Sequence, residues 1–136
     1  MELNATELKS FLDEKVQQYN TLAFINDDPI AIPHSFSKKE DIEIAAFFAA
    51  TIAWGNRKSI MTNARSLMKR MDSAPHDFIL NHTKDDLGVF DGFVHRTFQR
   101  EDVAFFVTRL QQLYKEYDGL EVLFTPKAEA VNMHAV

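Results

Sequence analysis

The fold of this chain is decided by one stretch in its middle, Ile42-Glu43-Ile44-Ala45-Ala46-Phe47-Phe48-Ala49-Ala50-Thr51-Ile52-Ala53-Trp54-Gly55-Asn56-Arg57-Lys58. No charged side chain occurs between Glu43 and Arg57, so a helix formed here is apolar on all sides. Such a helix is stable only where other elements cover most of its surface. Gly55 can adopt the left-handed conformation that ends helices at no steric cost. The stretch therefore predicts a buried central helix over about residues 38–54 and then a second helix that begins with two positive charges.

Hydroxyl and acidic side chains mark the start of the central helix. Ser37 and Glu40 have the spacing of a capping box, in which two side chains accept hydrogen bonds from backbone N–H groups that the first turn leaves unpaired. Asp41 and Glu43 add negative charge where the helix dipole favours it. We expect the large apolar side chains of this helix to lie in the core: Ile42, Ile44, Phe47, Phe48, Ile52 and Trp54.

Length and composition limit the class of protein. With 136 residues, of which 46% are hydrophobic, the chain can bury one core, so we expect a single helical domain over residues 1–136. The absence of cysteine excludes disulfides and thiolate metal sites. No apolar run is long enough to span a membrane, and Met1-Glu2-Leu3-Asn4 lacks the features of a signal peptide, which favours a cytoplasmic protein. The formal net charge of -5 argues against nucleic-acid binding by bulk charge, although clustered cations remain compatible with it.

Apolar residues at helical spacing predict three more long helices, which makes the expected fold an all-α, multi-helix globule around the central helix. Asn4 and Glu7 can cap a first helix, whose apolar face comprises Leu8, Phe11, Leu12, Val16 and Tyr19. Asn56 can cap the helix after Gly55, whose apolar face comprises Ile60, Met61, Ala64, Leu67, Met68 and Met71. Gly119 is expected to end a helix over about residues 100–117, whose inner face comprises Val103, Phe106, Val107, Leu110, Leu113, Tyr114 and Tyr117.

Shorter elements join these helices. Pro75 is typical of a helix start, and Thr83 with Asp86 is typical of a short turn. Residues 20–37 are expected to form a loop packed by four apolar side chains, Phe24, Ile25, Ile30 and Ile32. No segment has the pattern of a strand.

The end of the sequence resembles an unfinished helix. Thr125-Pro126 is typical of a helix start, and the apolar face that follows is incomplete at Val136. We therefore expect this chain to be the front part of a longer protein or a shortened product, with a missing C-terminal half or a protein partner covering that face.

The strongest candidate for chemistry is the corner from Trp54 to Lys58. A turn that leads into a helix offers free N–H groups and the positive end of the helix dipole, which suit a phosphate. The cations of the following helix then extend a basic stripe that suits a nucleic-acid backbone: Arg57, Lys58, Arg65, Lys69 and Arg70. Exposed Lys and Arg more often serve only solubility, and Trp54, which could stack on a base, is more often a core residue.

The remaining motifs indicate no catalytic, metal or cofactor site. His76-Asp77 resembles part of a metal-binding pair, but no further ligands occur at a suitable spacing. His95-Arg96 is a basic pair that can contact a ligand or pair with a nearby acid. His34 is expected to be a hydrogen-bonded structural residue. No nucleophile elbow and no glycine-rich phosphate loop is present.

Several of these segments resemble a known family. Asp41-Ile42-Glu43-Ile44-Ala45, Ala53-Trp54-Gly55-Asn56-Arg57-Lys58, His95-Arg96-Thr97-Phe98 and Leu120-Glu121-Val122-Leu123-Phe124 are similar to a bacterial conserved-hypothetical family described as domain of unknown function 2400. The resemblance spans about Asp28 to Phe124. Members of that family are longer, which implies further basic and acidic motifs beyond Val136.

A more distant likeness is to the helix-hairpin-helix DNA glycosylases. Residues 44–67 are similar to their pattern of an apolar helix, a turn that enters DNA and a second helix. Gly55 stands where such enzymes commonly place a glutamine that fills the gap left by a flipped base. The likeness implies that the catalytic lysine or aspartate and the hairpin lie beyond Val136 and that this chain alone is inactive.

Two functions of different class therefore remain open. The first is the N-terminal part of a DNA-binding, glycosylase-like protein whose phosphate contacts are Asn56, Arg57, Lys58, Arg65, Lys69 and Arg70, with His95 and Arg96 as additions. The second is a non-enzymatic helical module that binds another protein or its own missing half.

Overall fold

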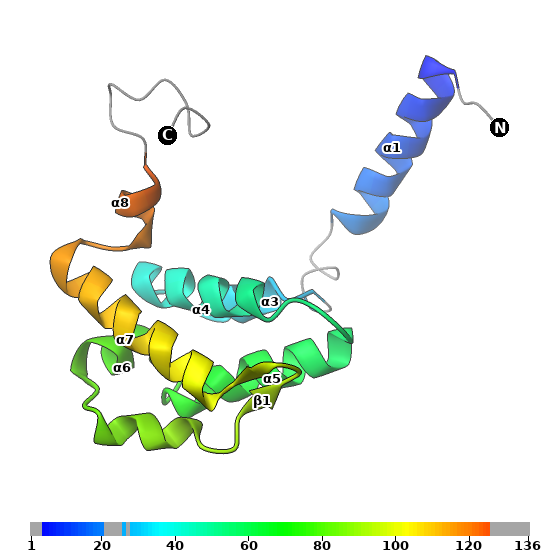
Figure 1. Ribbon diagram of the computed structural model, residues 1–136. Helices are drawn as coiled ribbons and strands as arrows, with labels where there is room; N and C mark the ends of the chain where they lie inside the picture. Colours follow the sequence, from blue (N-terminus) through cyan, green and yellow to red (C-terminus); the bar gives the residue numbers. More distant parts are fainter. Residues whose placement is uncertain (1–3, 21–25, 27, 126–136) are drawn as a thin grey trace.

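The computed structural model describes residues 4–20, 26 and 28–125 and is mainly helical, as predicted (Figure 1). The elements in chain order are α1 (Ala5–Tyr19), α3 (Ala31–His34), α4 (Lys39–Thr51), α5 (Arg57–Arg70), α6 (Pro75–Asn81), the 3-10 helix η1 (Asp85–Phe90), β1 (Val94–His95), β2 (Phe98–Gln99), α7 (Arg100–Glu116) and α8 (Leu120–Phe124). The prediction that no strand occurs is wrong at one place. Strands β1 and β2 form an antiparallel hairpin in which Val94 pairs with Gln99 and His95 with Phe98.

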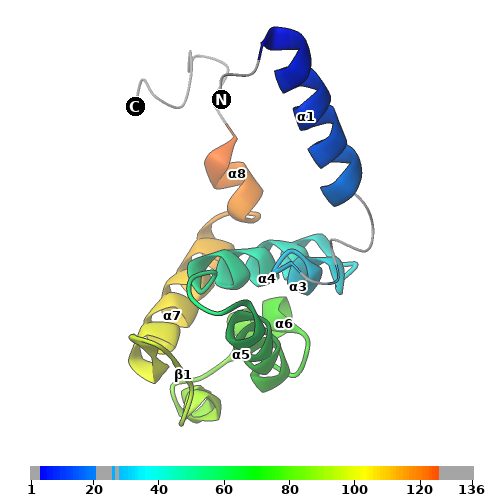
Figure 2. The same cartoon turned by 90° about the vertical axis from the view of Figure 1, so that its right-hand side faces the viewer.

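Helix α4 is the central element, as expected. It packs against α3, α5, α6 and α8, and the Phe47 ring meets the Phe106 ring of α7 edge to face at 5.3 Å (Figures 1 and 2). Ile44, Phe48 and Ile52 are fully buried. The predicted burial is wrong at both ends, where Ile42 and Trp54 are exposed; Ile42 lies in the first turn of α4, and Trp54 follows the end of the helix at Thr51.

The start of α4 also differs from the prediction. Its N-cap residue is Lys38, and no side chain caps the helix, so the capping box of Ser37 and Glu40 does not form. The other acids serve neighbouring helices instead. Asp41 accepts a hydrogen bond from the His76 backbone N–H at 2.9 Å and thereby caps α6.

Glu43 connects α4 to two further helices. Its carboxylate accepts hydrogen bonds from the Tyr114 hydroxyl at 3.1 Å and from the Glu121 backbone N–H at 2.6 Å. A side chain at Gly119 would bring its Cβ within 2.7 Å of Glu43 Oε1, so glycine is needed where α8 approaches α4. Burial of the phenol, together with the nearby Glu43 charge, raises the pKa of Tyr114.

Helices α5 and α6 confirm the sequence predictions closely. Asn56 caps α5 by accepting a hydrogen bond from the Ser59 N–H at 3.1 Å, and the whole predicted apolar face is buried. Pro75 is the first residue of α6. The Asp86 carboxylate, in the first turn of η1, accepts a hydrogen bond from the backbone N–H of Thr83, which precedes η1. These features depend on residues close together in the sequence.

Helix α7 confirms the inner face only in part. Val103, Val107, Leu110 and Tyr114 are buried, whereas Phe106 and Leu113 are half-buried and Tyr117 is exposed. The helix ends at Glu116, so Gly119 does not end it but precedes α8.

Helix α1 has the predicted capping box, since Asn4 and Glu7 exchange hydrogen bonds of 2.9 and 3.0 Å. The sequence predicts an apolar face on this helix, and α1 stands apart from α3 to α8 in both views (Figures 1 and 2). The side chains of Leu8, Phe11, Leu12 and Val16 are accordingly exposed. The Tyr19 side chain lies outside the described structure.

The predicted loop over residues 20–37 contains the short helix α3, in which Ile32 is buried, while Ile30 before it is exposed. Phe24, Ile25 and the expected helix start at Pro126 lie outside the described residues. Within the described part of the chain, no helix is both long and apolar enough to cross a lipid bilayer.

Candidate nucleic-acid interface

The corner between α4 and α5 is formed by local hydrogen bonds and one glycine. The Trp54 indole N–H donates to the Thr51 carbonyl at 2.9 Å, and Gly55 has a φ of +102°, which redirects the chain. Asn56 then caps α5 through Ser59, so its side chain is already occupied. In the described structure the N–H groups of Arg57 and Lys58, the first two of α5, have no hydrogen-bond partner. The corner therefore has the free donors that an anion requires.

The β1–β2 hairpin fixes the corner through His95. Asn63 Nδ2 lies 2.7 Å from His95 Nδ1, and His95 Nε2 lies 3.0 Å from the Trp54 carbonyl oxygen. Because Asn63 Nδ2 can only donate, Nδ1 accepts this hydrogen bond and the Nε2–H donates to the carbonyl. The His95 ring is only 2% exposed. His95 was predicted as a phosphate contact, but here both ring nitrogens bind protein groups and the residue positions the corner.

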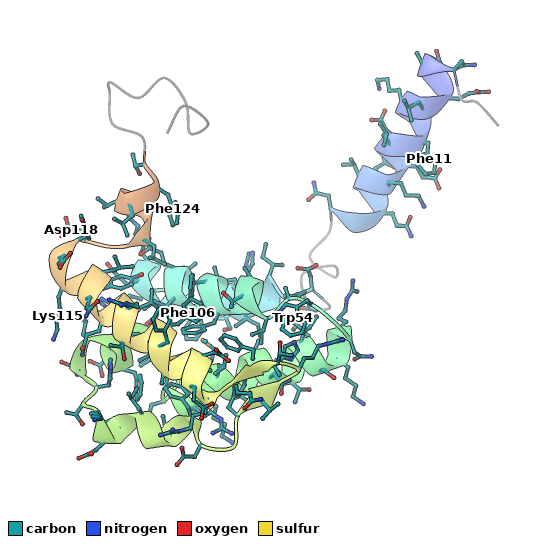
Figure 3. The ribbon with its side chains drawn as sticks, viewed as in Figure 1. Phe11, Trp54, Phe106, Lys115, Asp118 and Phe124 are labelled. Carbon is teal, nitrogen blue, oxygen red and sulfur yellow. The ribbon has the colours of Figure 1, made fainter. Side chains whose placement is uncertain are left out.

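The turn of the β1–β2 hairpin places Arg96 at the same corner. Its guanidinium lies over the Trp54 ring at 5.4 Å from the ring centre, and its backbone has a φ of +56°. A Cβ atom on Gly55 would lie 2.9 Å from Arg96 Nη1. Trp54, more often a core residue at such a position, is 38% exposed beside these groups (Figure 3). The corner thus presents an aromatic ring, a guanidinium and free N–H groups together.

The exposed side of α5 extends the positive charge away from the corner. Lys58, Arg65 and Lys69 are spaced at i, i+7 and i+11, which places them on one face of a helix with 3.6 residues per turn. We call these three residues the basic face. All three are exposed, and in the described structure none forms an ion pair. Arg57 is also exposed, next to the corner.

Arg70 has a different role from the one predicted for it. Its Nη1 donates to the carbonyl oxygens of Val89 at 2.7 Å and Asp91 at 2.9 Å, and its Nε donates to Ser66 Oγ at 3.2 Å. It therefore joins α5 to the end of η1. Of the eight predicted contacts, the structure leaves five cationic side chains at the surface: Arg57, Lys58, Arg65, Lys69 and Arg96.

An open cleft of about 960 Å³ borders the basic face. Sequence reasoning missed this cleft because it requires α3 to lie against the carboxyl half of α5, and α3 was expected to be loop. Its lining combines apolar and polar side chains and includes His34, Ser35, Phe36, Arg65, Lys69 and Ser73. His34 was expected to be hydrogen-bonded, but its side chain is exposed at the edge of α3.

Other titratable groups lie elsewhere and do not assemble a metal site. The His76 ring meets the Tyr114 ring edge to face at 5.1 Å, and its Nδ1 is buried with no hydrogen-bond partner in the described structure. Among the described residues, no group of three or more His, Asp or Glu side chains is placed to hold a metal ion.

Comparison with known proteins places most of this chain in a family. Residues 28–136 match the model of the family described as Protein of unknown function (DUF2400), which covers all elements from α3 onward and leaves out α1. No curated protein and no solved structure shows a significant match to this chain.

Proposed function

This chain belongs to the family described as Protein of unknown function (DUF2400), and we propose that it binds the phosphate backbone of DNA through the corner and the basic face. The observation that carries the proposal is a set of exposed cations along one helix, with no acidic partner in the described structure, beginning at a helix N-terminus with free N–H groups. Lysine and arginine that neutralise phosphates release counterions, and this release supplies most of the affinity for a nucleic-acid backbone. The net charge of -5 does not oppose such binding, because binding depends on the local field at the surface that meets the ligand.

In the finer form of this proposal, the protein is glycosylase-like and these residues position DNA. The arrangement of α4, the Gly55 corner and α5 supports it, because an apolar helix followed by a turn and a basic helix is the pattern on which the likeness rests. In this proposal the described residues contact DNA, and none of them has a catalytic role.

The test is binding to a fluorescent DNA duplex across a salt series, measured by anisotropy. Wild type should bind with an affinity that falls steeply as salt rises. Arg57→Glu combined with Lys58→Glu removes two phosphate contacts, so the slope of log affinity against log salt should fall by about 2. Lys84→Glu combined with Lys115→Glu is the matched control, because it changes the net charge equally at exposed positions away from the corner.

The control variant should bind like wild type. The proposal is wrong if wild type does not bind at low salt, or if the control weakens binding as much as the corner variant does.

A second candidate function is supported by exposed apolar side chains. Val122, Leu123 and Phe124 of α8 are exposed, as is the apolar face of α1, which includes Phe11 (Figure 3). Apolar surface gathered on two helices suits a protein partner. Association of this kind is not weakened by salt, so a salt series that uses chain self-association or partner capture as its readout separates the two functions.

A further inference from the structure

We infer that the cleft between α3 and α5 holds an unpaired nucleotide, so that the preferred ligand of the basic face is single-stranded nucleic acid. This inference rests on the proposed function and specifies its substrate class. The site consists of the cleft and the basic face together, because Arg65 and Lys69 belong to both.

The chemistry of the lining suits a base attached to a phosphate. Arg65, Lys69 and His34 stand at the cleft, and none of the described residues that line it is acidic. The apolar part of the lining comprises Ala31, Ile32, Phe36 and Met68; Ile32 and Met68 are buried at its base, and the half-buried Ala31 and Phe36 offer a methyl group and an aromatic ring to a flat base. Stacking on aromatic side chains combined with a cationic groove is the usual way in which proteins hold single strands.

The turn that ends α5 contributes a polar residue to the same cleft. Ser73 lines it, and Asp72 and Ser73 have φ values of +59° and +54°. These residues form the C-terminal cap of α5, in which the N–H groups of Asp72 and Ser73 donate to the carbonyls of Lys69 and Met68 at 3.0 and 2.9 Å, and this cap fixes the position of Ser73 at the cleft.

The extent of the basic face argues for a polymer over a free nucleotide. From Lys58 to Lys69 the helix rises about 16 Å, at about 1.5 Å per residue. A nucleic-acid strand carries one phosphate per about 3.4 Å in a duplex and fewer per length when extended, so this face spans several phosphates. Paired bases point to the inside of a duplex, and one of them can enter a cleft only after unpairing and unstacking. A base in a single strand is already unpaired, so it can enter the cleft without the loss of a base pair.

The first experiment compares a fluorescent oligothymidylate with a duplex of equal length at low salt. Wild type should bind the single strand at least about tenfold more tightly, a difference in the range of one stacked base. Ser35→Phe fills the cleft from an exposed position and should remove that preference while leaving duplex affinity unchanged. Ser35→Ala is the matched control, because both variants lose the 2.6 Å hydrogen bond from Ser35 Oγ to the Ile32 carbonyl, but only phenylalanine fills the space.

A second experiment uses wild-type protein and does not depend on a variant that folds. Irradiation of a bound single strand that contains 5-iodouracil should give an adduct at His34 or Phe36, located by mass spectrometry of the digested protein. Adducts confined to Trp54 would place the bases at the corner and overturn the inference.

The outcomes separate this inference from the proposed function. Salt-dependent binding to single strand and duplex with equal affinity, insensitive to Ser35→Phe, overturns the cleft and leaves the phosphate contacts standing. If thymidine monophosphate binds as tightly as oligothymidylate, the inference that the ligand is a polymer is wrong. Absence of binding to both nucleic acids at low salt overturns both proposals.

Discussion

Replacing Gly55 with alanine is expected to destabilise the fold and to move Arg96 away from Trp54. Two separate effects add at this position. The backbone φ of +102° is unfavourable for any residue with a Cβ atom, and the new Cβ would lie 2.9 Å from Arg96 Nη1 and 3.1 Å from Arg96 Cδ. The arginine side chain must therefore move.

Two other glycines allow the magnitudes to be separated. Gly92 has a φ of +81° but no atom within 4 Å of an added Cβ, so Gly92→Ala should cost only the backbone term, about 1–2 kcal/mol. Gly55→Ala should cost the same term and also the contact of Arg96 with Trp54, about 0.5–1 kcal/mol at an exposed site, which gives about 1.5–3 kcal/mol in total. Gly88 lies in η1 with its nearest atom at 3.9 Å, so Gly88→Ala should leave the free energy of unfolding unchanged or slightly raised.

Urea unfolding measures these differences with two probes. Circular dichroism follows the whole helical fold, while Trp54, the only tryptophan in the sequence, reports on the corner by its fluorescence. Gly55→Ala should change the native emission of Trp54, whereas Gly92→Ala should lower stability without changing it.

The reasoning about this corner is refuted if Gly55→Ala and Gly88→Ala have equal free energies of unfolding. It is refuted in part if Gly55→Ala and Gly92→Ala are equally destabilised with unchanged Trp54 emission, because the contact with Arg96 would then contribute nothing.

Two further predictions concern the core and its ionisable groups. Phe48→Ala should lower the free energy of unfolding by about 3–5 kcal/mol, because this ring is fully buried under several helices. The exposed Phe105→Ala should cost under about 1 kcal/mol in the same urea titration, and equal losses would contradict the assignment of the core. The native pKa of Tyr114 is raised by burial and by Glu43, so the phenol stabilises the fold fully below the unfolded pKa of about 10 and this stability is lost as pH rises beyond it. Between pH 8 and 11, the free energy of unfolding of Tyr114→Phe should therefore fall less than that of wild type. If it falls as much as in wild type, Tyr114 is not the source of the loss.

The features that the sequence predicted well are those determined by near neighbours. The cap of α5 by Asn56 joins residues three apart, and the burial of Ile60, Ala64 and Leu67 follows from the helical period alone. The basic face is predictable for the same reason, because regular spacing along one helix determines which cations share a side. The family was also identified from short segments, and the match over residues 28–136 confirms it.

The features that the sequence did not predict depend on partners far along the chain. Arg70 resembles any surface arginine until the carbonyls of Val89 and Asp91 are placed beside it, 19 and 21 residues away. His95 reaches Asn63 and Trp54 only through a hairpin whose strands are two residues long, too short to show an alternating pattern.

The exposed apolar face of α1 marks a different limit. Helical spacing predicts which side chains share a face, but it does not say whether another element covers that face.

The hydrogen bond from the His76 N–H to Asp41 has a consequence for the order in which this chain folds. Helix α6 has seven residues, too few to be stable alone, and its N-terminal N–H group finds an acceptor only 35 residues earlier in the chain. Helix α4 must therefore be in place before α6 gains its cap, and that contact closes a long loop at an entropic cost. We therefore expect α6 to form after α4 in folding, and we expect local opening of the native protein to begin there more readily than in α4 or α5.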